Sequence, residues 1–270
     1  MDFGQAEQSR TAINEWVEEQ TNKKIKELIP ERSIDASTKL ILVNAIYFKA
    51  DWDVKFCKSR TYEQDFHVSP TQKVQTDMMH STAKYGMLRS VTELNGATAL
   101  EMPYKGKRMS MIFLLPAIGL HATYSSLGDL EEAMLKVNDL NSILKFEQKS
   151  VVDVTLPSFK LESQLDLVEP LKQLGMTDMF DEAKADFSGM TGGTNKHLFV
   201  SQVVQKAFIE VNEEGTEAAA ATFVGFMETS AAGSPPPPPR FTCDRPFMFL
   251  IRDNLTGMIL FSGQVTDPTK

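Results

Sequence analysis

The sequence has few of the residues that disulfide frameworks and metal sites require. Only two of its 270 residues are cysteines, Cys57 and Cys243, and they lie far apart in the chain. Two cysteines cannot form a disulfide framework, and no C-x-x-C pair is present to bind a metal or to support redox chemistry. We therefore expect both thiols to be free, and we expect neither a metal site nor a cofactor.

Long apolar runs and an excess of basic charge are also missing. No run approaches the ~18 apolar residues that a membrane-spanning helix needs, and the opening stretch, MDFGQAEQSR, lacks the pattern of a secretory signal. The chain has 28 Lys and Arg against 36 Asp and Glu, so its net charge is −8. Because phosphate repels so acidic a chain, we expect no nucleic acid as a partner, and because no long apolar run is present we expect no membrane as a partner.

The motifs of common catalytic sites are absent as well. The sequence contains no G-x-S-x-G, no H-E-x-x-H, no phosphate-binding P-loop and no G-x-G-x-x-G. The four histidines, His67, His80, His121 and His197, are not at ligand spacing from one another or from a cysteine. We therefore predict that the protein is not an enzyme, and we assign no catalytic residue.

The N-terminal sequence predicts helix followed by strand. Phe3, Ala6, Ile13 and Val17 recur at helical spacing, which indicates an amphipathic helix. The run KKIKELI predicts a second helical turn that ends before the proline at position 30. Residues 39–48, KLILVNAIYF, are apolar on both faces, which predicts a covered strand in the middle of a sheet. Asn44 within that strand then needs a hydrogen-bond partner.

The rest of the chain mixes strands and helices without a regular β-α-β period. ATALEMPY and MSMIFLLP, joined by KGKR, predict a hairpin, and residues 126–144 predict two short helices. VVDVTLPSFKLE alternates as a strand does, LDLVEPLKQLG predicts a helix closed by Gly175, and residues 197–215 predict a long strand. PFMFLIRD and GMILFSGQV predict a last pair of strands. We predict an α+β fold whose sheets are mainly antiparallel.

One stretch, TEAAAAT, permits two interpretations. Alanine favours a helix, but about seven residues are too few for a helix that is stable alone in water. The alternative is an extended segment, with Gly215 as a hinge before it. Thr216, Ala218, Ala220 and Thr222 would then share one face, and Glu217, Ala219 and Ala221 the other. Side chains this small could enter a sheet without displacing its core.

Several segments in a fixed order resemble the serpin family, and specifically its ovalbumin-like, leukocyte elastase inhibitor-like branch. They are INEWVEEQTNKKIKELI, LVNAIYFKADW, LPSFKLE, ADFSGMTG, FIEVNEEGTEAAAAT and DRPFMFLIRDNLTGMILFSGQV. The resemblance covers essentially the whole chain, so residues 1–270 are expected to form a single serpin domain. It also implies that the family's N-terminal third is missing, so the main sheet would have an exposed edge and the chain alone would be a poor inhibitor.

The resemblance implies a serine protease inhibitor that acts as a suicide substrate. Residues of about 213–240 would form an exposed reactive-centre loop, and after cleavage the loop would insert into the main sheet as a new strand. The hinge residues implied are Glu213, Glu214, Gly215, Thr216, Glu217, Ala218, Ala219, Ala220, Ala221 and Thr222. The implied shutter and breach residues are Asn44, Trp52 and Gln205, with Gln205 able to bond to Asn44. Ser158 stands where a basic residue often pairs with Glu213.

Family spacing places the scissile bond between Thr229 and Ser230, which favours an elastase-like protease as target. Cleavage after Phe226 or Met227 would suit a chymotrypsin-like enzyme, and Arg240 lies too far along for normal insertion. The five prolines that precede Arg240 predict a polyproline II segment, which we interpret as a spacer.

Two other classes of function stay open. The chain could be a non-inhibitory serpin acting as chaperone, carrier or storage protein, or a truncated fragment without activity. A monomer is expected. The ovalbumin-like branch favours a cytoplasmic location, but many serpins are extracellular.

Overall fold

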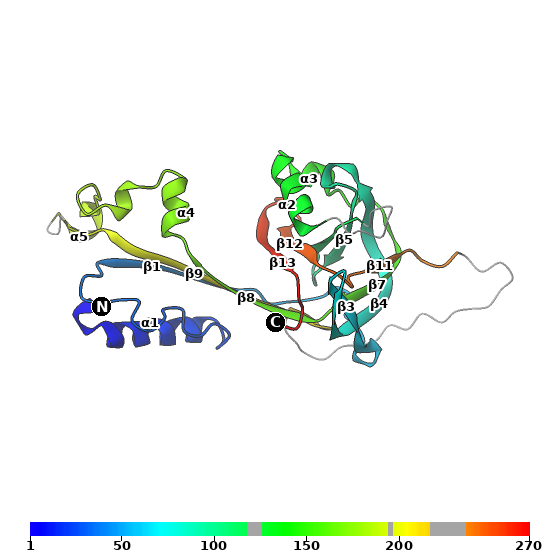
Figure 1. The fold of residues 1–270 in the computed structure, drawn as a ribbon, viewed down its shortest axis with the longest axis horizontal. Coiled ribbons are helices and arrows are strands. Elements are labelled where there is room, and N and C mark those ends of the chain that lie inside the picture. Colours follow the sequence, from blue (N-terminus) through cyan, green and yellow to red (C-terminus); the bar gives the residue numbers. More distant parts are fainter. Residues whose placement is uncertain (118–125, 194–196, 217–235) are drawn as a thin grey trace. The chain divides into compact units, whose positions relative to one another are not determined.

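The computed structural model describes residues 1–117, 126–193, 197–216 and 236–270. The predicted hinge residues 217–222 and the predicted bond between Thr229 and Ser230 lie outside these ranges. The chain forms two compact units: residues Met1–Phe48 with Leu161–Ile209, and residues Lys49–Lys160 with Glu210–Lys270 (Figure 1).

In the first unit, a helix covers one face of a small sheet. Helix α1 (Ala6–Gln20) follows a short 3-10 turn, η1 (Phe3–Gln5), whose N-cap is Asp2. Ile13 and Val17 of α1 are buried against Val204 of the sheet, so the predicted amphipathic helix is confirmed. Figure 1 shows α1 running alongside strand β1 (Leu40–Tyr47).

The small sheet has the strand order β1, β9 (Val200–Val211), β8 (Phe159–Asp166). Strands β1 and β9 are parallel, and their register places Asn44 opposite Gln205. β1 is an end strand of this sheet among the described residues, and Leu42 is 41% exposed. The predicted strand is therefore present, but two parts of the prediction are wrong. β1 lies at the end of the sheet and not in its middle, and α1 covers only one of its two apolar faces.

The second helical turn predicted for KKIKELI is also wrong. The backbone after α1 takes positive φ at Asn22, Lys23 and Glu27, which no right-handed helix allows. The apolar side chains are buried nonetheless, because the side chain of Asn14 fixes this segment. Its Oδ1 accepts a hydrogen bond from the backbone N–H of Ile29 at 2.8 Å, and its Nδ2 donates to the carbonyl of Ile29 at 2.9 Å.

Three short helical turns complete the first unit. They are α4 (Val168–Gln173), η4 (Asp178–Phe180) and α5 (Ser188–Thr191). Gly175 follows α4 with a φ of +93°, a conformation that glycine adopts without strain. The predicted helix closed by Gly175 is thus confirmed, although it begins later than its sequence suggested.

The second unit is built on a large, mainly antiparallel sheet. Its strand order is β11, β7, β4, β5, β6, β12, β13, with β3 paired to β4. The strands are β3 (Thr61–Ser69), β4 (Gln72–Val91), β5 (Ala97–Pro103), β6 (Met109–Leu115), β7 (Lys149–Pro157), β11 (Arg240–Thr242), β12 (Phe247–Asp253) and β13 (Ile259–Val265). The predicted hairpins, β5 with β6 and β12 with β13, are both confirmed.

Two short helices cover one face of this sheet, as predicted for residues 126–144. Helix α2 (Leu127–Lys136) begins at a capping box formed by Ser126 and Asp129, and α3 (Leu140–Ile143) begins at Asp139. Leu130 of α2 and Leu144 after α3 pack on residues of strands β5, β6 and β12. Short turns η2 (Lys58–Arg60) and η3 (Thr92–Leu94) precede β3 and β5.

The α+β class with mainly antiparallel sheets is confirmed. Only β1 with β9 and β11 with β7 are parallel among the described pairs. Both cysteines are free thiols: Cys243 is buried and Cys57 is half-exposed. None of the described helices is long and apolar enough to cross a membrane.

Candidate functional site

The predicted loop begins at a tight turn that reverses the chain after β9. The backbone N–H of Asn212 donates to the carbonyl of Gly215 at 2.9 Å, and the N–H of Gly215 donates back to Asn212 at 3.2 Å. The side chain of Asn212 also accepts a hydrogen bond from the N–H of Glu214 at 3.0 Å. The chain therefore leaves this turn antiparallel to the strand by which it entered.

After the turn, Gly215 and Thr216 form strand β10, which pairs antiparallel with β2 (Ala50–Asp51). Gly215 has a φ of +140°, and a Cβ there would lie 2.6 Å from Cα of Asp51 and 2.7 Å from the backbone N of Trp52. Only glycine allows this approach, which explains physically why a glycine stands at the predicted hinge.

Trp52, the predicted breach residue, lies directly beneath the turn. Its side chain is buried, its ring stacks on Tyr104 at 4.6 Å between centroids, and its Nε1 donates to the carbonyl of Asn212 at 3.0 Å. Its backbone N–H donates to the carbonyl of Glu214 at 2.9 Å. Side chain and backbone of one tryptophan thus hold both sides of the turn.

Sequence reasoning missed the lysines that hold this turn. The carboxylate of Glu214 is 4% exposed and lies 3.1 Å from Nζ of Lys58 and 3.7 Å from Nζ of Lys55. Lys55 also pairs with Asp51 at 3.3 Å. The sequence carried no signal for these pairs, because the lysines lie far from Glu214 in the chain. We call Glu214, Lys55 and Lys58 the hinge clasp.

Glu213, the other acidic residue of the turn, contributes its backbone. Its carbonyl accepts a hydrogen bond from the N–H of Phe56 at 2.8 Å. The resemblance leads one to expect a basic residue at position 158, but Ser158 stands there. Its backbone N–H donates a hydrogen bond to the carbonyl of Asp77 at 2.9 Å. The ionic support of the turn therefore comes through Glu214.

The predicted hydrogen bond between Asn44 and Gln205 is formed, and it lies in the first unit. Nδ2 of Asn44 donates to Oε1 of Gln205 at 3.2 Å, across the parallel ladder of β1 and β9. The side-chain amide of Gln205 is thus the hydrogen-bond partner that Asn44 needs. Strands β1 and β9 are paired along residues 40–47 and 200–208, with no strand between them.

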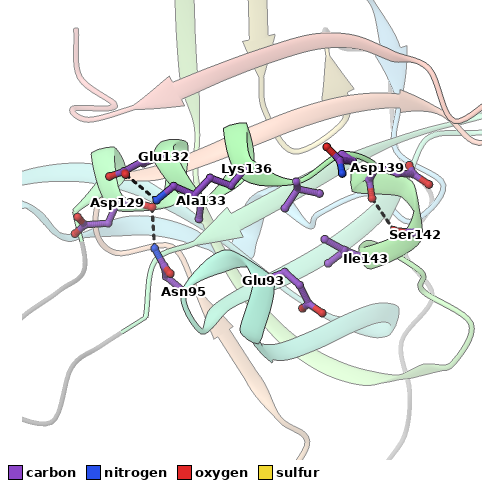
Figure 2. Close-up of a pocket in the computed structure, with 11 residues that line it drawn as sticks. Glu93, Asn95, Asp129, Glu132, Ala133, Lys136, Asp139, Ser142 and Ile143 are labelled. Carbon is purple, nitrogen blue, oxygen red and sulfur yellow. Dashed lines mark hydrogen bonds and ion pairs between the residues drawn. The ribbon is translucent and has the colours of Figure 1, made fainter.

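A groove between helices α2 and α3 and the turn η3 is a separate feature, in the second unit. It measures about 530 Å³ and is lined by Glu93, Asn95, Asp129, Glu132, Ala133, Lys136, Val137, Asn138, Asp139, Ser142 and Ile143 (Figure 2). Asp129 and Asp139 cap helices there, and Glu132 pairs with Lys136 at 2.7 Å. The described residues contain no group of three or more His, Cys, Asp or Glu that could hold a metal ion.

Comparison with known proteins agrees with the fold. The family model "Serpin (serine protease inhibitor)" matches residues 1–268. Human Serpin B4 is 43% identical over 99% of this chain and 66% of its own length, and human leukocyte elastase inhibitor is 40% identical over 99% and 69%. The crystal structure of Serpin48 from the insect Tenebrio molitor, "a highly specific serpin", superposes with a TM-score of 0.78 at 34% identity over 99% of this chain and 66% of its own.

The chain belongs to the serpin family, and its relatives include the ovalbumin-type members to which its sequence pointed. It spans about two thirds of the length of the curated relatives it matches.

Proposed function

We propose that this chain is the loop-bearing part of a serine protease inhibitor that acts as a suicide substrate. The observation that carries the proposal is the turn at Asn212–Gly215, which reverses the chain at the end of β9 while β1 and β9 are still paired side by side. Inhibition by insertion needs a chain that reverses its direction after β9 and a β1–β9 ladder that can open.

The direction of the chain favours insertion between β1 and β9. Those two strands are parallel, and a segment leaving the turn runs opposite to β9. Inserted between them, it would replace one parallel ladder by two antiparallel ladders, which are slightly more stable per residue. A new strand of roughly ten residues gains about 1 kcal/mol per net hydrogen bond, on the order of 10 kcal/mol in all.

The composition of the hinge supports the same function. Thr216 and Ala218 to Ala221 are small and uncharged, so their insertion buries no unpaired charge, which would cost several kcal/mol. No proline stands among them to remove a donor from the ladder. Glu217 would lie on the opposite face of the inserted strand from Thr216.

The chemistry itself belongs to the protease. Its serine hydroxyl attacks the carbonyl carbon of Thr229, the amine of Ser230 leaves, and an ester joins the two proteins. Insertion of the loop then competes with hydrolysis of that ester. The small side chain of Thr229 favours an elastase-like enzyme, and a bond after Phe226 or Met227 would favour a chymotrypsin-like one.

The test is to incubate the purified chain with neutrophil elastase, chymotrypsin and trypsin, and to separate the products on denaturing gels. The proposal predicts a covalent complex with elastase, in low yield because the chain alone is expected to be a poor inhibitor, and a released peptide that begins at Ser230 by mass spectrometry. In parallel, thermal melting should show the cleaved chain to be more stable than the intact chain, because insertion adds a strand.

Cleavage near Thr229 without a complex and without a rise in melting temperature would contradict insertion and favour a non-inhibitory serpin. A raised melting temperature without a complex would show insertion that is too slow to trap the ester. A chain that does not unfold cooperatively would favour the inactive fragment.

A further inference from the structure

Four prolines and an arginine, residues 236–240, form an exposed segment that the proposed inhibition does not use. Pro236, Pro237 and Pro238 are exposed, Pro239 is half-buried, and the side chain of Arg240 is 81% exposed. So many apolar rings in a row on a surface need a physical reason, since they contribute nothing to a core.

The segment has one conformation available and a defined outward side. Each proline fixes its own φ and forces the residue before it into an extended form, which together give a polyproline II helix of about three residues per turn. Pro236 and Pro239 therefore share one edge, Pro237 and Arg240 a second, and Pro238 lies on the third. Pro237, Pro238 and Arg240 are all exposed, so the second and third edges face solvent, whereas on the first edge only Pro239 is half-buried.

The segment is also anchored at its C-terminal end. The carbonyl of Pro239 accepts a hydrogen bond from the backbone N–H of Asp153 at 2.9 Å, and Arg240 begins β11, in register with Asp153 of β7. β11 is an end strand of the large sheet among the described residues, as Figure 1 shows beside β7. A rigid, anchored segment loses little conformational entropy when a partner binds it.

We propose that residues 236–240 are a docking site for a polyproline-binding domain of the SH3 type. Aromatic grooves of such domains accept the proline rings on two edges of a polyproline II helix. Arg240 indicates which class of polyproline-binding domain would bind. A guanidinium beside the proline rings suits a groove bordered by an acidic pocket, where it would form charge-assisted hydrogen bonds. Its ion pair within this chain is long, 3.8 Å from Nε to Oδ2 of Asp153, so a partner's carboxylate can compete for it.

This site is independent of the proposed inhibition. Residues 236–240 lie C-terminal to Thr229 and Ser230, so cleavage of that bond would leave them attached to β11, β12 and β13. An SH3 domain should bind the intact and the cleaved chain equally well.

The test is a titration of a ¹⁵N-labelled SH3 domain that selects arginine-containing proline peptides with the purified full chain. We expect saturable shifts confined to the aromatic groove and acidic pocket of the probe. Arg240→Gln should weaken binding about tenfold, which corresponds to the loss of one charge-assisted contact. The double change Pro237→Ala and Pro238→Ala should abolish saturation. Arg89→Gln makes the same charge change at another exposed position and should leave the affinity unchanged.

Three results would overturn the proposal. They are the absence of saturable shifts, an affinity that Arg240→Gln does not change, and binding to a WW domain or to profilin but not to the SH3 probe. As a control, the melting curve of each variant is compared with that of the parent chain. If the curves superpose, the variant is folded, and any loss of binding comes from the changed segment.

Discussion

Oε1 of Glu214 lies 3.1 Å from Nζ of Lys58, at the point where the chain turns back after β9. The two ends of this pair differ in environment, because the glutamate side chain is 4% exposed and the lysine side chain 69%. Lys55, which is 18% exposed, lies 3.7 Å from the other carboxylate oxygen. The hinge clasp therefore consists of one buried charge held from two sides, and the base of the loop depends on both lysines.

Removing both lysines should destabilise the chain much more than removing either alone. Lys58→Met leaves Lys55 in place and removes a mostly hydrated charge, so we expect a loss of at most about 1 kcal/mol. Lys55→Met with Lys58→Met leaves a buried carboxylate without a counter-charge, which costs roughly 3 kcal/mol. Urea unfolding of the purified chain measures both. Lys136→Met, whose pair with Glu132 is exposed on both sides, is the control and should change little.

The same double variant offers a rescue experiment. Adding Glu214→Gln removes the uncompensated charge and should restore most of the lost stability, because a neutral amide needs no counter-ion. If the double variant were as stable as Lys136→Met, the hinge clasp would contribute nothing to the fold.

Gly215→Ala should destabilise the turn. The new Cβ would collide with the backbone of β2, and the φ of +140° is strained for any residue with a side chain, so we expect a loss of about 1–3 kcal/mol. Gly189→Ala is the matched control, since nothing lies within 4 Å of its added Cβ. It should be neutral or slightly stabilising in the same urea titration. If the two variants had equal free energies of unfolding, the pairing of β10 with β2 would contribute nothing to stability.

Thr216→Arg tests the proposed insertion directly. Burying an unpaired guanidinium at the first inserting position should slow insertion, so hydrolysis of the ester would win. We expect the yield of covalent complex with elastase to fall at least about tenfold, while the rate of loop cleavage stays the same. Thr216→Ser, which keeps a small hydroxyl, should retain the complex. An unchanged yield for Thr216→Arg would contradict insertion from this hinge.

Local pattern was sufficient to predict most elements of this fold. Alternating or continuous apolar runs around short turns located the hairpins β5–β6 and β12–β13, and helical spacing located α1. The need of Asn44 for a hydrogen-bond partner could also be predicted, because a polar residue in an apolar strand demands one, whereas Gln205 as that partner was implied by the resemblance to serpins. The hairpins and the helix depend on interactions between residues that are near in sequence. The need of Asn44 follows from a single polar side chain without an obvious hydrogen-bond partner.

The features that sequence could not predict depend on long-range contacts. KKIKELI has helical spacing, but the amide of Asn14 holds the backbone of Ile29 in a non-helical path. No periodicity carries that information. The hinge clasp likewise joins Glu214 to lysines more than 150 positions earlier, and the apolar run of β1 does not reveal that only one of its faces is covered.

The two thiols should differ sharply in reactivity. Cys57 is half-exposed, and hydrogen bonding to Ser59, with the charge of Arg60, lowers the pKa of its thiol. Cys243 is fully buried, and burial raises the pKa of its thiol well above the usual range. A disulfide reagent at pH 8 should label one thiol quickly and the second at least about a hundredfold more slowly, because the second requires local unfolding. Cys57→Ser should remove the fast phase only. Two fast phases would contradict the burial of Cys243.

His80 should make the stability of the second unit sensitive to mild acid. Its ring stacks on Tyr62 at 4.5 Å, and its Nδ1 lies 3.1 Å from Oγ1 of Thr155. Burial, and then the charge of Arg60, lower the pKa of His80, against a smaller opposite effect of Asp153. The unfolded chain, with a histidine pKa of about 6.5, therefore takes up the proton first as the pH falls.

The contribution of His80 is complete above about pH 6.5 and is lost as the pH falls from that value through the lower folded pKa. His80→Gln removes this dependence. The difference in free energy of unfolding between parent and variant, measured by urea titration from pH 7.5 downward, should shrink below about pH 6.5, because acid effects at other groups are common to both chains. A difference that stays constant over this range would show that His80 titrates alike in the folded and unfolded chain.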